Sequence, residues 1–376
     1  MPIYKMEGKK DGRQKYRVRV NYRDRSGKGR QVDRIAFGLD DAKFLELRLT
    51  RELKDDAPDS SMTVRELLSE YQIVKKHEVR ESTLNKTMRI LEYHVMPTFE
   101  NARLDKLNTA ALQRWKTAME NKNLSLTTRQ NVFREFNAML NFAVKMEHIA
   151  KNPLSRLGNF RSSMEVKRTI EFYTAEEFKL YKAAAEAIVT KAEKDGHWHE
   201  WGFFVFFAVA FYTGLRKGEI HALQWDDING KHLTVNRSIT QKLKGGDRET
   251  PPKNMTSIRT IQIPQPLIET LADHKNRCEN IEGFGDHFKV CGGLRSLRDS
   301  TVQNRNELYA KAAGLKTIRI HDFRHSHASL LANEKINIQE IARRLGHAKI
   351  EITWNIYSHL YPREEERAIE ILDKIV

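Results

Sequence analysis

The chain has 376 residues and is 40% apolar, which is enough for two or three domains with buried cores and too much for a disordered protein. It has no apolar run near the ~20 residues of a membrane span and no apolar stretch after its charged start, so we expect neither a membrane protein nor a signal peptide. Two cysteines, Cys278 and Cys291, exclude a disulfide framework and fit a cytoplasmic location. The net charge of +15 favours a polyanionic partner.

The first segment, residues 1–56, has the pattern of a small basic β-sheet followed by a helix. Alternation places Tyr16, Val18, Val20 and Tyr22 on one face of a strand and a row of cations on the other. A turn at 26–29 leads to a returning strand at 31–38, and a helix follows at 41–54. Residues 1–34 hold twelve Lys or Arg against four acids, a net charge of +8. A solvated sheet face is one explanation; the charge density favours a DNA-binding face, with these candidate contacts: Arg17, Arg19 and Lys28.

A helical region, residues 62–157, comes next. Its periodicity predicts helices at 63–76, 82–97, 108–121 and 125–148. The last of them carries an apolar stripe that we interpret as core: Val132, Phe136, Met139 and Phe142. Several cations could face DNA phosphates, with Lys86 as the candidate contact among Lys75, Lys76, Lys86 and Arg89. Polar stretches at 55–62 and 160–169 predict linkers on either side.

The remaining region, residues 169–376, mixes helices with a few strands. Thr174 and Glu177 form a capping-box pattern at the start of a helix. The apolar run 201–215 predicts a buried helix that ends at Gly214. Two strands are expected at 232–243 and 256–264, joined by a charged loop, and the rest reads as helical. The whole chain is therefore predicted to be α+β, and mainly α.

Five side chains in this region could together cut a phosphodiester without a metal: Arg216, His321, Arg324, His347 and Tyr357. An arginine fork binds two phosphate oxygens and stays charged. His321 and Arg324 lie three apart at the start of a helix, so they face the same way. A phenol has a pKa of about 10 and needs nearby cations to become a nucleophile. Taken singly, each has an ordinary alternative, such as a surface ion pair between Arg216 and Glu219.

Two patterns raise the alternative of a metal site. His321, His325 and His327 are spaced as HxxxHxH, but Arg324 among them would repel a cation and no glutamate follows as in a zinc protease, so His325 and His327 are interpreted as structural. A second set has spacing reminiscent of a zinc site and remains open: His274, Cys278, His287 and Cys291. We expect no metal and no cofactor.

The motifs TGLRKGE, HDFRH, LGH and WNIYSHL occur in this order and resemble those of the tyrosine recombinases, the phage integrase family. The resemblance implies that Arg216, Arg324 and His347 bind the scissile phosphate, that His321 assists proton transfer and that Tyr357 is the nucleophile. Tyr361 is the rival nucleophile, but the spacing from His347 and the following Ser358-His359 favour Tyr357. The family also carries a general-acid lysine between two strands, matched here by Lys253, with Lys242 and Lys244 as alternatives.

The resemblance implies a site-specific DNA recombinase that integrates and excises a mobile element through a 3′-phosphotyrosine intermediate. It divides the chain into an arm-type DNA-binding domain (1–56), a helical core-binding domain (62–157) and a catalytic domain (169–376). The implied partners are double-stranded DNA attachment sites, three further copies of the chain in a homotetramer on DNA, and an excisionase or host DNA-bending protein. The alternatives are a type IB topoisomerase, which relaxes DNA without recombining it, and a non-catalytic DNA-binding relative.

Overall fold

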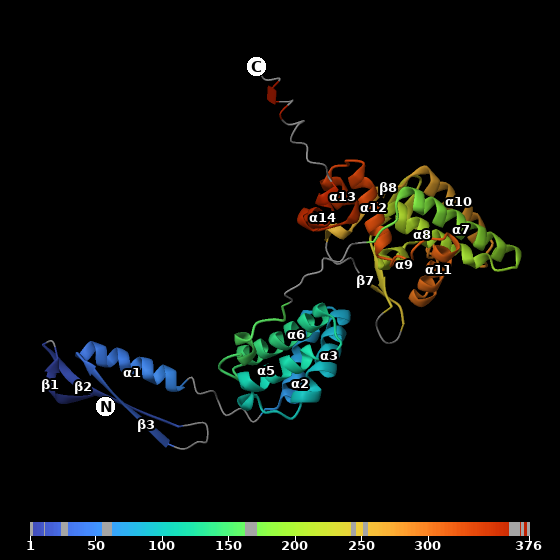
Figure 1. Ribbon diagram of the computed structural model, residues 1–376. Coiled ribbons are helices and arrows are strands. Elements are labelled where there is room, and N and C mark those ends of the chain that lie inside the picture. The colour runs from blue at the N-terminus through green and yellow to red at the C-terminus, as the bar shows by residue number, and fades with distance from the viewer. Residues whose placement is uncertain are drawn as a thin grey trace. The chain divides into compact units, whose positions relative to one another are not determined.

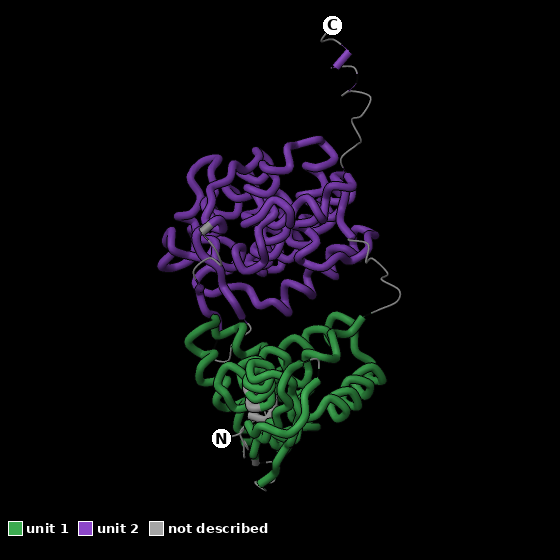
Figure 2. Tube along the Cα trace, turned by 90° about the vertical axis from the view of Figure 1, so that its left-hand side faces the viewer, with its two compact units in different colours: residues 1–166 green, residues 167–376 purple. Residues whose placement is uncertain are grey.

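The computed structural model describes residues 3–10, 12–23, 29–54, 62–161, 171–241, 246–250 and 255–360, together with Ile369, Leu372 and Asp373. The chain forms two compact units, residues 1–166 and 167–376 (Figure 2). Five residues named in the predictions, four lysines and the rival tyrosine, lie outside the described residues: Lys28, Lys242, Lys244, Lys253 and Tyr361. Among the described helices, none is long and apolar enough to cross a membrane.

The N-terminal part is a three-stranded antiparallel sheet with one helix packed on it (Figure 1). Its elements are β1 (Ile3–Lys10), β2 (Arg13–Arg23), β3 (Gly29–Phe37) and α1 (Leu39–Lys54). Val18 and Val20 of β2 are buried with Ala42 and Leu49 of α1, as the alternation in the sequence predicted. The sequence did not reveal β1, because its side chains are mostly exposed and it carries almost no apolar alternation.

The helical region that follows has its own apolar cluster. Its elements are α2 (Val64–Glu78), α3 (Glu81–His94), α4 (Met96–Phe99), α5 (Thr109–Glu120) and α6 (Leu126–Lys145). The four predicted helices are confirmed, and the short α4 is an addition that begins where Val95 ends α3. The predicted stripe of α6 is buried in the cluster: Val132, Phe136, Met139 and Phe142.

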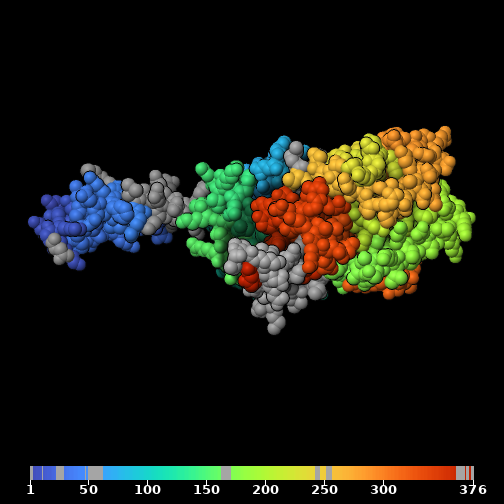
Figure 3. Space-filling model, turned by 90° about the horizontal axis from the view of Figure 1, so that it is seen from above, coloured from blue at the N-terminus to red at the C-terminus, as the bar shows by residue number. Residues whose placement is uncertain are grey.

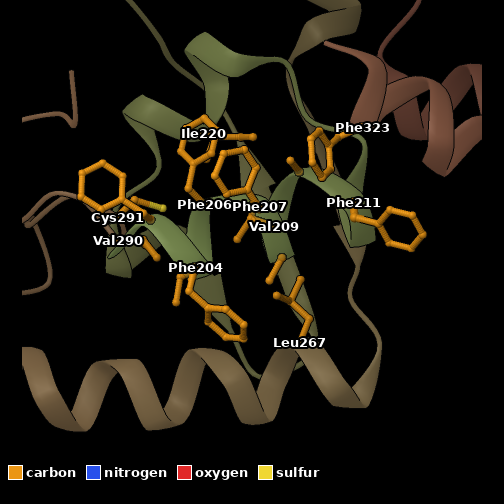
Figure 4. Close-up of a cluster of buried hydrophobic side chains, with 14 of the residues drawn as sticks. Phe204, Phe206, Phe207, Val209, Phe211, Ile220, Leu267, Val290, Cys291 and Phe323 are labelled. Carbon is orange, nitrogen blue, oxygen red and sulfur yellow. The ribbon is translucent and has the colours of Figure 1, made fainter. Parts of the chain in front are cut away.

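The second unit is built around one buried helix, α8. Its helices are α7 (Ala175–Lys194), α8 (Trp201–Thr213), α9 (Lys217–Ala222), α10 (Gln265–Cys278), α11 (Asp299–Ala312), α12 (Asp322–Asn333), α13 (Ile338–Leu345) and α14 (Ile350–Tyr357). The capping box of Thr174 and Glu177 is confirmed. Nearly all of α8 is buried, since it is apolar on every side, and its phenylalanines pack against Leu267 of α10 and Phe323 of α12 (Figure 4). This helix supports the elements that carry the candidate site.

The strands of the second unit are more broken than predicted. They are β4 (Ile228–Asn229), β5 (His232–Val235), β6 (Ser238–Thr240), β7 (Arg248–Thr250) and β8 (Arg259–Gln262). The single strand expected at 232–243 is two strands: β5 pairs with β8, whereas β6 pairs with β7. The chain breaks where Asn236 and Arg237 turn to bond Asp227, with donor–acceptor distances of 3.0 and 2.6 Å. These side-chain hydrogen bonds compete with strand pairing at Asn236 and Arg237. The sequence predicted one strand because its alternation continues through this break.

Gly214 ends α8 in the left-handed conformation, with φ of 65°. A Cβ there would lie 2.8 Å from Cδ2 of His327 and 2.9 Å from Cδ2 of Leu345. We expect Gly214→Ala to lower the free energy of unfolding of this unit by about 2–4 kcal/mol, because backbone strain and overpacking add.

The matched control is Gly230→Ala, where φ is 54° and no atom lies within 4 Å of the added methyl. Only the backbone strain applies there, so the loss should be about 1 kcal/mol. Urea unfolding of the two variants measures the difference. Equal losses would show that the end of α8 is not tightly packed.

Candidate active site

Arg216 lies two residues beyond Gly214, at the start of α9. Its backbone N–H donates to Glu219 Oε2 at 2.9 Å, and its Nη1 donates to Glu219 Oε1 at 2.9 Å. Its Nη2 donates to the carbonyl oxygen of Gly346, 130 positions away, at 3.2 Å. The ion pair raised as an ordinary alternative therefore exists, and the separate bond to Gly346 holds the same guanidinium at the end of α13.

Arg324 is buried in the first turns of α12, with 3% of its surface exposed. It donates to the carbonyl oxygens of Gly214 at 2.7 Å and Leu345 at 2.6 Å. Within the described part of the chain, none of its hydrogen bonds ends on a carboxylate. Burial, and after it the charge of Arg216, lower the pKa of Arg324 to about 9, so the guanidinium remains charged at neutral pH. A buried cation held by carbonyl oxygens is an attractive partner for an anion.

Glu219 and Arg259 complete the base of the site. Arg259 Nη2 donates to Glu219 Oε2 at 2.9 Å, and its Nε donates to the carbonyl oxygen of Arg344 at 2.6 Å. Burial alone would raise the pKa of Glu219, but Arg259 and then Arg216 outweigh it and lower that pKa. Glu219 is therefore ionised, and it orients both arginines. Three guanidinium groups with one such carboxylate leave an excess of positive charge.

Sequence reasoning missed Arg259. Arg259 and the buried Ile261 are two residues apart on β8, so both side chains point to the same side of the strand. A cation at an inward position of a strand needs a buried partner. That signal could have identified it.

His347 and His321 lie in the same electrostatic environment. His347 follows Gly346, which ends α13 with φ of 64°, and its Nδ1 lies 2.7 Å from the hydroxyl of Thr353. Burial, followed by Arg324 and Arg216, lowers the pKa of His347 to about 4. Burial, followed by Arg324, also lowers the pKa of His321. Both imidazoles are therefore neutral at pH 7.

Tyr357 is the last residue of α14 and is 3% exposed. Its ring packs in a small cluster with Ala328, Ala332, Ile341 and Leu345, and its hydroxyl lies 2.6 Å from Nδ1 of His325. Burial raises the pKa of Tyr357 above its usual value, while the charge of Arg324 opposes the rise. The phenol is therefore protonated at neutral pH. His325, which the sequence suggested was structural, contacts this hydroxyl.

The structure thus brings together five of the six predicted catalytic residues, through α9, α12, the turn after α13 and α14; Lys253 lies outside the described residues. The α12–α14 segment forms part of the molecular surface (Figure 3, red). An arrangement of one buried and one partly exposed arginine, neutral imidazoles and a protonated phenol suits binding of a phosphodiester and nucleophilic attack on it.

The predicted DNA contacts lie in the first unit. Arg19 forms a two-pronged ion pair with Asp33, at 2.9 and 3.0 Å. Arg17 is opposite Ile35 in the β2–β3 register, on the sheet face turned away from α1. Lys86 lies on α3, and its side chain is exposed.

Two members of the zinc-like set lie side by side, since Cys278 Sγ is 3.7 Å from His274 Nε2. His274 Nε2 donates to the carbonyl oxygen of Val290 at 2.8 Å, and Cys278 and Cys291 are both buried. Among the described residues, no three His, Cys, Asp or Glu side chains form a group that could hold a metal ion.

Comparison with known proteins gives a consistent result. The profile of the family described as "Phage integrase family" matches residues 179–364, and that of "Phage integrase, N-terminal SAM-like domain" matches residues 63–119. The ICEBs1 integrase of Bacillus subtilis is 26% identical over 91% of this chain and 92% of that protein. A "Tyrosine recombinase XerC-like" protein of Caldanaerobacter subterraneus is 29% identical over 72% of this chain and 71% of that protein.

Two solved structures share the fold. The Tn1549 transposon integrase in complex with a circular intermediate DNA has a TM-score of 0.64 and 19% identity, over 84% of this chain and all of that chain. A lambda integrase tetramer bound to a Holliday junction has a TM-score of 0.56 and 20% identity, over 97% of this chain and 95% of that chain. The two profile matches, the relatives and the common fold lead to one conclusion: the chain belongs to the phage integrase family and is a tyrosine-type site-specific DNA recombinase.

Proposed function

We propose that this recombinase cuts and rejoins double-stranded DNA through a 3′-phosphotyrosine at Tyr357, to integrate and excise the mobile element that encodes it. The observation that carries the proposal is the meeting of Arg216 and Arg324 at the end of α13, where Arg324 is buried and donates to carbonyl oxygens only, within the described residues. A phosphate is the natural counterion for such a pair.

The first step is binding of the scissile phosphate. Arg216 and Arg324 bind its non-bridging oxygens, while Glu219 and the carbonyl groups of the 345–346 turn hold both forks in place. If the Thr353 hydroxyl donates to Nδ1 of His347, the ring proton is on Nε2, so His347 can donate to a phosphate oxygen as well. These contacts strengthen as negative charge grows on the phosphorane.

The second step is attack by the Tyr357 hydroxyl on phosphorus. The phosphate becomes attached to the tyrosine, and the 5′ oxygen leaves with a proton from Lys253, the general acid that the family resemblance implies. The phosphotyrosine conserves the energy of the broken bond, so no nucleotide cofactor is needed. Attack by the 5′ hydroxyl of another strand reverses the step and exchanges the strands.

The organisation of the chain supports this function. We propose three domains: 1–56 binds the outer arms of the element, 62–157 binds the core site, and 169–376 is catalytic. The two apolar clusters of the first unit are consistent with two separate domains in residues 1–157. The solved relatives were bound to DNA, and one was a tetramer. We propose a homotetramer on DNA attachment sites in the cytoplasm, assisted by an excisionase or a host DNA-bending protein.

A covalent-trapping experiment tests the proposal. The full-length protein is incubated with a nicked duplex that spans the end of its element, and the products are denatured in detergent. We expect a protease-sensitive protein–DNA adduct and, from two duplex sites, recombinant products. DNA relaxation without recombinants would indicate a type IB topoisomerase, and binding without an adduct would indicate a non-catalytic relative.

The N-terminal sheet gives a prediction about DNA affinity. Arg17→Ala should lower the slope of log affinity against log salt by about 0.9, because one phosphate contact is lost. Arg19→Ala should lower it less, because Asp33 already neutralises that side chain. The control is Lys43→Ala, which removes one charge from an exposed position of α1, the helix on the other side of the sheet. Equal slopes for Arg17→Ala and Lys43→Ala would show that the sheet face does not contact DNA.

A further inference from the structure

The proposed mechanism leaves the proton of the Tyr357 hydroxyl without an assigned acceptor at close range. Nδ1 of His325 lies 2.6 Å from this hydroxyl oxygen, and the two ring centroids are 5.9 Å apart. That is hydrogen-bond distance, at which a proton can pass directly. His321, to which the family resemblance assigned proton transfer, packs edge-on against the ring of His325, with centroids 5.2 Å apart.

We propose that His325 is the general base of the cleavage step: its Nδ1 takes the proton of Tyr357 as the hydroxyl oxygen attacks phosphorus. The inference rests on the proposed function. The O–H bond of Tyr357 breaks as the new O–P bond forms, the P–O bond to the 5′ carbon's oxygen breaks, and that oxygen takes a proton from the general acid. In the rejoining step, His325 returns its proton to the tyrosine oxygen.

The geometry of α12 makes this pairing specific. His325, Ala328 and Ala332 are spaced at i, i+3 and i+7, so they share one face of the helix. Ala328 and Ala332 form part of the apolar cluster that holds the Tyr357 ring. The face that receives the ring therefore also presents the imidazole to its hydroxyl. Arg324 precedes His325 by one residue, so the same helix carries the phosphate-binding group and the base.

The groups around His325 keep its ring neutral, so Nδ1 has a free lone pair within reach of the Tyr357 hydroxyl. The groups that act on it are His321, Asp322, Arg324 and Arg319, and Tyr357 contacts it from α14. Burial and then His321 lower the pKa of His325 to about 4, with Asp322 opposing. His325 is therefore neutral at pH 7. With Nδ1 accepting from the phenol, its ring proton is on Nε2.

His325→Asn and His325→Ala in the full-length protein separate proton transfer from positioning. An asparagine amide can occupy the place of Nδ1 and keep a hydrogen bond to the phenol, but it cannot take a proton. We expect both variants to cleave a nicked duplex about 100-fold or more slowly than wild type in single turnover. DNA affinity should be unchanged, which confirms that each variant is folded.

The dependence on pH supplies a second readout. Between about pH 6 and pH 9, titration of His325 should not change the wild-type cleavage rate, since its imidazole is neutral throughout this range. The rates of both variants should rise with pH, because the phenol must then lose its proton to water or hydroxide. Added imidazole should partly restore His325→Ala, and this comparison within one variant is independent of its stability.

Four results would overturn the inference. A wild-type rate in His325→Asn, with loss only in His325→Ala, would show that the side chain merely positions Tyr357. Faster cleavage by His325→Ala would show that the contact restrains the nucleophile. If the wild-type protein itself formed no adduct, the proposed function would fall and this inference with it, whereas normal adduct formation by all three proteins would overturn the inference alone.

Discussion

Tyr357→Phe is expected to bind DNA as the wild-type protein does and to form no covalent adduct. The substitution removes one oxygen atom from a ring that stays packed against α12 and α13. The lost hydrogen bond to His325 should cost about 0.5–1.5 kcal/mol of unfolding free energy, which leaves the protein folded. Because the hydroxyl is the proposed nucleophile, the loss of cleavage should be complete within detection.

The control for this variant is Tyr173→Phe. Tyr173 is also buried and its hydroxyl donates one hydrogen bond, to the carbonyl oxygen of Lys316 at 2.6 Å. It should lose similar stability and keep full adduct formation. Adduct formation by Tyr357→Phe at any rate near that of Tyr173→Phe would exclude Tyr357 as the nucleophile.

Arg324→Lys is expected to slow cleavage by about 10²–10³-fold. The lysine keeps one positive charge but loses the planar fork that donates to two carbonyl oxygens and that we propose binds the phosphate. Binding of uncleaved DNA should change far less, since the arginine acts mainly on charge that develops during attack. Single-turnover cleavage and an affinity measurement on the same duplex separate the two effects.

Arg319→Lys is the matched control, because Arg319 lies just before the same helix but its side chain is 72% exposed and paired with Asp322. It should change the cleavage rate by less than about twofold. Equal effects of the two substitutions would place the phosphate elsewhere than at Arg324.

The side chains proposed to react were easier to find in the sequence than the side chains that support them. Arg216, His321, Arg324, His347 and Tyr357 could be recognised because each lies in a short local motif. Their support comes from residues far apart in the chain, such as the bond from Arg259 to Arg344, which are 85 positions apart. No local pattern encodes such a contact, so Arg259 was missed. His325 was interpreted as structural, and its contact with the Tyr357 hydroxyl could not be predicted, because the two residues lie 32 positions apart.

In the fold, too, locally encoded elements were predicted, and elements that depend on distant contacts were not. The helices α2, α3, α5 and α6 were predicted because their apolar periodicity is strong, and α8 because it is a continuous apolar run. The two small sheets of the second unit were only partly predicted, since the break between β5 and β6 depends on the hydrogen bonds of Asn236 and Arg237 to Asp227. β1 was missed because its side chains are mostly exposed and the strand depends on pairing with β2.

The most direct test of the account is to find which residue becomes attached to DNA. The full-length protein is trapped on a nicked duplex in the presence of EDTA, digested with protease, and the DNA-linked peptide is sequenced by mass spectrometry. The account predicts a 3′-phosphotyrosine at Tyr357, formed at an undiminished rate without divalent metal because arginines supply the charge stabilisation. Attachment at Tyr361, or cleavage that requires magnesium or zinc, would contradict it.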